Sequence, residues 1–65
     1  MNERQRELMV EVATDVFTFE EEKKRTLSAK HKAFLISELV NSCMSRGVAY
    51  KDNPLRDVLF SLPWK

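Results

Sequence analysis

Apolar residues recur at every third or fourth position between residues 8 and 19, which is the period of an α-helix. The stripe is wide, because it takes in roughly half of the helix circumference. One neighbouring helix cannot cover a face of that width. We therefore expect this first helix to contact two others, or one helix and a second copy of the chain. The stripe consists of Leu8, Met9, Val10, Val12, Ala13, Val16, Phe17 and Phe19.

The end of this first helix is open to two interpretations. Thr18 and Glu21 have the spacing of a capping box, which would start a new helix at Phe19. Against this, Glu20 and Lys24 stand four residues apart and form a pair that favours helix. Because no Gly or Pro occurs before residue 47, we predict one long helix that continues to about residue 24.

A second apolar period begins just after Ser28, which is a favourable N-cap residue. We predict a helix over about 28–46. It should end at Gly47, which can adopt the left-handed conformation that closes a helix. The side chains expected to face the core are Ala29, Ala33, Ile36, Leu39, Val40, Cys43 and Met44.

A short third helix is predicted over about 54–62, after a connector at residues 48–50. Pro54 suits the first position of a helix, and Pro63 ends the apolar period. No segment has the pattern of a strand. The sequence therefore predicts an all-α fold of three helices in one domain, residues 1–65. The core stripe of the third helix would be Leu55, Val58, Leu59 and Leu62.

The chain has 65 residues, 43% of them hydrophobic, with one Gly, two Pro and a net charge of +1. This composition is too apolar for a disordered linker, so the chain should fold. A domain of this size buries only about 60% of the surface of its unfolded chain. One Cys and one His cannot supply a disulfide or a zinc site. We therefore expect self-association, as a homodimer, to supply the missing stability.

The cellular location is predicted from what the sequence lacks. The longest apolar run covers only residues 33–36, so neither a signal peptide nor a membrane span fits. A single Cys is typical of a reducing compartment. We expect a cytoplasmic protein, or a nuclear one in a eukaryote, without a membrane contact.

The sequence contains no pattern of residues that is typical of a catalytic site. His31 stands between two lysines and is expected to be a solvated surface residue. Cys43 falls within a core stripe and is expected to be a buried structural thiol. No nucleophile and base, no metal-ligand cluster and no glycine-rich phosphate loop can be assembled. We therefore predict no enzyme activity, no cofactor, no metal and no small-molecule substrate.

Four large apolar residues lie away from the main stripes. Phe34 and Leu35 point away from the predicted core face of the second helix, and Phe60 does so on the third helix, with Trp64 following. Such residues mark a contact surface for a partner, or else the wide first helix covers them. We expect Leu59 and Leu62 to dock, with Phe60 and Trp64 left for the partner.

The only strong charge asymmetry is a run of basic residues without an acid between residues 23 and 32. It can form a solvated surface, contact phosphates, or bind an acidic protein. We predict a small non-enzymatic regulatory or adaptor module that binds itself and another protein. The alternative is a small DNA-binding regulator of transcription or replication. Its phosphate contacts would be Lys23, Lys24, Arg25, Lys30 and Lys32.

Overall fold

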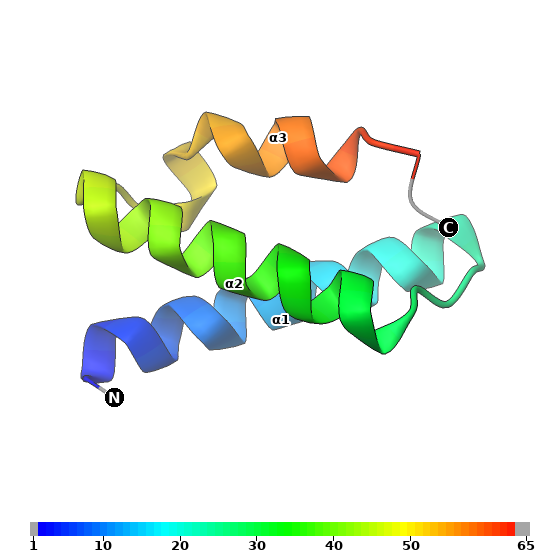
Figure 1. Cartoon of the computed structure of the whole chain (residues 1–65), viewed down its shortest axis with the longest axis horizontal. Helices are drawn as coiled ribbons and strands as arrows, with labels where there is room; N and C mark the ends of the chain where they lie inside the picture. Colours follow the sequence, from blue (N-terminus) through cyan, green and yellow to red (C-terminus); the bar gives the residue numbers. More distant parts are fainter. Residues whose placement is uncertain (1, 64–65) are drawn as a thin grey trace.

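The computed structural model describes residues 2–63 of the chain as a helical domain without strands in that range (Figure 1). The predicted all-α fold of three helices is confirmed. A short 3₁₀ turn, which the sequence did not indicate, stands before the third helix. The elements are α1 (Glu3–Lys23), α2 (Ala29–Arg46), η1 (Tyr50–Asp52) and α3 (Pro54–Phe60).

Helix α1 is continuous, as predicted. Asn2 caps its start, where the side-chain oxygen accepts a hydrogen bond of 2.7 Å from the backbone N–H of Gln5. The Thr18 hydroxyl donates to the carbonyl of Thr14 inside the helix, so Thr18 does not start a new helix. The helix ends where Lys24 takes the left-handed conformation, with φ of 52°. This position more often carries Gly.

Helix α2 has the predicted boundaries. The Ser28 hydroxyl accepts a hydrogen bond of 3.1 Å from the backbone N–H of His31. Gly47 closes the helix with φ of 65°, and its N–H donates to the carbonyl of Cys43 at 2.9 Å. Both ends are therefore determined by local residues that the sequence already marked.

Helix α3 starts as predicted but ends earlier. Asn53 is its N-cap, since its side-chain oxygen accepts from the N–H of Leu55, and Pro54 occupies the first turn. The helix stops at Phe60 instead of residue 62. Because the chain leaves the helical register there, Leu62 is 44% exposed, and the prediction that Leu62 docks is wrong.

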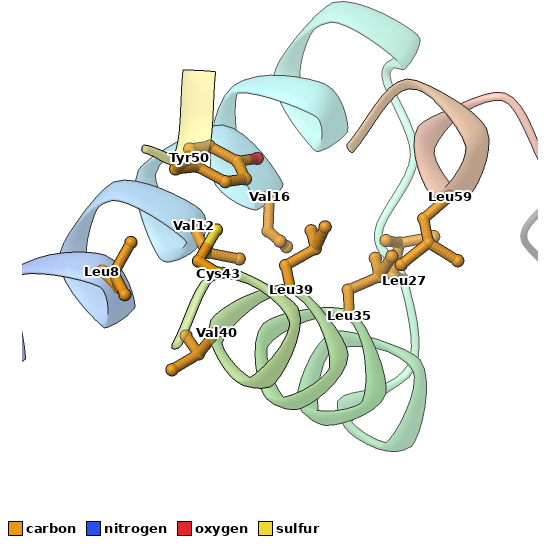
Figure 2. Close-up of a cluster of buried hydrophobic side chains, with 10 residues drawn as sticks. All are labelled: Leu8, Val12, Val16, Leu27, Leu35, Leu39, Val40, Cys43, Tyr50 and Leu59. Carbon is orange, nitrogen blue, oxygen red and sulfur yellow. The ribbon is translucent and has the colours of Figure 1, made fainter. Parts of the chain in front are cut away.

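The helices α1 and α2 run antiparallel as a hairpin, and α3 lies along one side of this pair (Figure 1). The buried side chains come from all of these elements and form one cluster (Figure 2). The core thus sits between the helix pair and residues 50–60, which form η1 and α3 and which we call the carboxy-terminal segment. Its members are Leu8, Val12, Val16, Leu27, Leu35, Leu39, Val40, Cys43, Tyr50 and Leu59.

The buried face of α2 differs from the predicted one. Leu35, expected on the exposed side, is 0% exposed, whereas Ala29, Ala33 and Met44, expected in the core, are exposed. The reason is the position of α3, whose Leu59 belongs to the same buried cluster as Leu35. The buried side of α2 is therefore turned toward α3.

Candidate functional site

The two sides of the α1–α2 pair differ in what covers them. The carboxy-terminal segment packs on one side, and the other side carries a groove of about 450 Å³ between α1 and α2. None of the residues that line this groove is charged. They are Gln5 and Met9 from α1, and Ala33, Ile36, Ser37, Val40 and Asn41 from α2.

The groove belongs to a larger apolar surface, which we call the open face. Residues four apart on a helix lie on the same side, so Ala13 and Phe17 continue the row that Met9 begins. Met44 continues the row of Val40 on α2 in the same way. Phe17 is 61% exposed, and Met9 and Met44 are also exposed. The open face therefore presents large apolar side chains from both long helices.

Glu20 lies at one end of the open face, where it contacts two residues that follow α1. Its Oε2 atom lies 3.2 Å from Lys32 Nζ and accepts a hydrogen bond of 2.7 Å from the backbone N–H of Leu27. Lys32 Nζ also stands 5.8 Å from the centre of the Phe17 ring. These contacts tie the end of α1 to the turn before α2 and keep the Lys32 side chain along the protein surface.

The basic residues gather around the turn between α1 and α2. Lys23, Lys24, Arg25 and Lys30 are exposed there, whereas Lys32 is partly buried in its ion pair with Glu20. Glu20 and Glu21 line a shallow depression together with Lys24 and Arg25. The structure therefore brings the predicted basic residues to one end of the molecule, beside carboxylates.

The four predicted partner residues do not form one surface. Phe34 is 45% exposed, whereas Leu35 is buried in the core, so the prediction that Leu35 faces a partner is wrong. Phe60 is half-buried and packs against Phe19 of α1 with 5.3 Å between ring centres, so it is not left wholly free for a partner. Trp64 lies outside the described residues.

A polar cluster joins the carboxy-terminal segment to α1. The hydroxyl of Tyr50 donates to Asp15 Oδ2 at 2.8 Å, and Arg56 Nε donates to the same oxygen at 2.8 Å. The guanidinium of Arg56 also stands over the Tyr50 ring, 5.3 Å from its centre. Asp15 therefore receives one bond from η1 and one from α3.

The ionisation of this cluster follows from its burial and its bonds. Burial of Tyr50, which is 4% exposed, raises the pKa of its phenol, and the bond to Asp15 raises that pKa further. The hydrogen bond with Asp15 also raises the pKa of Arg56. At neutral pH the phenol is therefore a neutral donor, and its role in the cluster is structural.

Sequence reasoning missed this cluster because residues 48–50 were expected to be a connector. One signal was present, since Asp15 stands directly beside Val16, which belongs to the apolar stripe of α1. A carboxylate at such a position calls for a partner from elsewhere in the fold. Nothing in the sequence identifies Tyr50 and Arg56 as those partners.

A second polar contact secures the start of α3. Asn53 is nearly fully buried, and its Nδ2 donates to Ser42 Oγ at 3.0 Å and to Cys43 Sγ at 3.3 Å. Cys43 is buried, as predicted. His31, expected to be solvated, is partly buried at the start of α2.

Residues 2–63 hold no group of three or more His, Cys, Asp or Glu side chains that could bind a metal ion. Within the same range no helix has the length and apolar character needed to cross a membrane. Comparison with protein-family models, curated proteins and solved structures found no match.

Proposed function

We propose that this protein is a small non-enzymatic regulatory or adaptor module that acts through protein–protein contact as a homodimer. The observation that supports this proposal is the open face of the α1–α2 pair. Exposed Met9 lines the uncharged groove there, and exposed Phe17 stands about two turns further along α1. Large apolar side chains that are exposed together on one face are typical of an interaction site.

The size of the chain supports the same proposal. A domain of 65 residues has a small core, and the buried cluster here lies on only one side of the two long helices. Covering the other side would bury further apolar surface, and each Å² of it removed from water contributes a stabilising free energy of about 25 cal/mol. Association would therefore stabilise the fold as well as serve its function.

Sedimentation of the full chain over a range of protein concentrations tests the homodimer. We expect the dimer mass at micromolar concentrations, together with a melting temperature that rises with protein concentration. A monomer mass throughout, with a melting temperature independent of concentration, would refute the proposed homodimer.

A second candidate function is binding of DNA by the basic end of the molecule. It is favoured by the exposure of Lys23, Lys24, Arg25 and Lys30 around one turn. If these residues contact phosphates, affinity for random duplex DNA falls steeply with added salt, and Lys24→Glu weakens it without unfolding the domain. Lys51→Glu in η1 is the matched control. Undetectable binding at low salt would exclude this candidate.

A further inference from the structure

The open face has a symmetry that identifies one occupant. We propose that a second copy of the chain covers it, with the two α1 helices packed antiparallel about a two-fold axis at Ala13. This inference rests on the proposed homodimer and assigns its interface. Two-fold dimers are the commonest closed assemblies, and their contact surface must be complementary to itself.

The residues of α1 on this side show that complementarity. Arg6, Met9, Ala13, Phe17 and Glu20 are separated by steps of three, four, four and three, so the row is the same when counted from either end. Steps of three and four are those of helices that pack along their length. In the antiparallel arrangement Met9 faces the partner's Phe17, and Ala13 faces the partner's Ala13.

The charges at the ends of this row are complementary in the same arrangement. Arg6 lies opposite the partner's Glu20, so a cation meets a carboxylate at each end of the contact. Lys32 approaches the same carboxylate from within its own chain. A parallel two-fold pair would instead place Arg6 against the partner's Arg6. The charge pattern therefore selects the antiparallel orientation.

The shape of the face fits this arrangement. Ala13, at the axis, is the smallest side chain of the row and allows the two helices to approach closely. The partner's Phe17 would lie over Met9, next to the groove that Ile36 and Val40 line. That groove contains no charged side chain, so an aromatic ring can enter it without desolvating an ion.

The open face has the area of a small dimer interface. A standard interface buries about 800 Å² on each partner, which is roughly one sixth of this chain's surface of 4613 Å². The 18 residues of α2 measure about 27 Å, and two helices side by side are about 20 Å wide. The open face therefore has a flat footprint of about 540 Å², or about 1,080 Å² for two copies, which just exceeds the roughly 1,000 Å² expected of a specific interface.

Cross-linking across the axis tests the proposed register. In the full chain, Ala13→Cys should form a disulfide-linked dimer under mild oxidation, because the two new thiols face each other. Glu11→Cys, which introduces an exposed thiol on the opposite side of α1, is the control and should remain unlinked. The native Cys43 is buried and does not interfere.

Charge reversal gives an independent measurement that leaves the core intact. Arg6→Glu should raise the dimer dissociation constant by at least about tenfold, because it sets two carboxylates against each other at both ends of the contact. Lys51→Glu makes the same charge change outside the open face and should leave that constant within about twofold. Circular dichroism should show unchanged helix content in both variants.

The outcomes separate this inference from the proposed function. Cross-linking of Ala13→Cys together with weakening by Arg6→Glu supports the antiparallel α1 contact. A dimer that is unaffected by Arg6→Glu and not linked by Ala13→Cys overturns this interface and leaves the homodimer itself standing. If Ala13→Cys does not fold, the comparison of Arg6→Glu with Lys51→Glu decides. A wild-type chain that stays monomeric overturns both proposals.

Discussion

The two sides of the α1–α2 pair are built from the same helices and yet are used differently. The side that faces η1 and α3 carries leucines and valines in close contact, with Asp15 as a polar anchor for Tyr50 and Arg56. The open face carries small residues beside exposed Met9 and Phe17. The difference shows that a single third helix covers only one side of a pair of long helices.

The cause is that one further helix, α3, can pack on only one side of the pair. Helix α3 has seven residues and measures about 10 Å, against 21 residues and about 32 Å for α1. The shorter helix reaches only one side of the pair, where it joins Leu35 and Leu59 in one cluster. Stability of the monomer should therefore depend on the covered side, and association on the open face.

The largest expected effect comes from a leucine of the covered core. Leu39→Ala should lower the free energy of unfolding by about 3 kcal/mol, because it leaves a cavity at a fully buried position. Leu62→Ala, which truncates an exposed leucine, is the control and should change that free energy by less than about 0.5 kcal/mol. Urea denaturation at a fixed protein concentration measures both, and equal effects would contradict the described core.

The polar anchor is expected to have the next largest effect. Asp15→Ala should lower the free energy of unfolding by about 2 kcal/mol, because the nearly buried hydroxyl of Tyr50 loses its acceptor and Arg56 loses its partner. Asp57→Ala removes an exposed carboxylate of α3 and serves as the control in the same urea experiment. A loss no greater than that of Asp57→Ala would show that the cluster does not hold the carboxy-terminal segment.

The raised pKa of Tyr50 predicts a dependence of stability on alkaline pH. The folded state favours the neutral phenol, so its contribution is fully present below the unfolded pKa of about 10. It is lost progressively as pH rises from about 10 toward the higher folded value. At pH 11 the free energy of unfolding of the wild type should have fallen by about 1 kcal/mol from its value at neutral pH. Tyr50→Phe, which has no phenol at this position, should not show this loss.

The measurement can be made on one group, since Tyr50 is the only tyrosine. Ultraviolet absorbance of the phenolate should give a pKa above the ordinary value in the folded protein, and Asp15→Asn should bring it closer to that value. An ordinary pKa in the wild type would contradict the buried position of the hydroxyl.

The smallest effect on the monomer is expected at the open face. Phe17→Ala should change the unfolding free energy of dilute protein by less than about 0.5 kcal/mol, because the ring is mostly exposed. The same substitution should weaken self-association in sedimentation at higher concentration. Val58→Ala truncates an exposed apolar residue on α3 and should leave self-association unchanged. If both variants associate equally, Phe17 does not belong to the interface.

The sequence predicted the helices well because their ends depend on neighbouring residues. Ser28, Gly47 and Pro54 each act within one helical turn, so their roles can be read without knowing the fold. The buried side of α2 depends instead on where α3 docks, and the periodicity around Leu35 carries no information about that. Local capping was therefore predictable, and the orientation of a wide apolar face was not.

The candidate site also combines a feature that the sequence predicted with one that depends on contacts between distant residues. An excess of apolar width on α1 was evident in the sequence, and it indicated a second contact for that helix. The cluster of Asp15, Tyr50 and Arg56 joins residues 35 and 41 positions apart, and no pattern of nearby residues indicates such a pairing. Contacts of this separation follow from the packed fold.

The same long separations determine the order in which the chain can assemble. The α1–α2 hairpin closes through the short turn between Lys23 and Ala29, whereas the bond from Tyr50 to Asp15 closes a loop of 35 positions. Short loops cost less chain entropy to close and close faster. We therefore expect the hairpin to form first and η1 and α3 to dock onto it afterwards. In native fluctuations the amide hydrogens of α3 should accordingly exchange with solvent before those at the centre of α2.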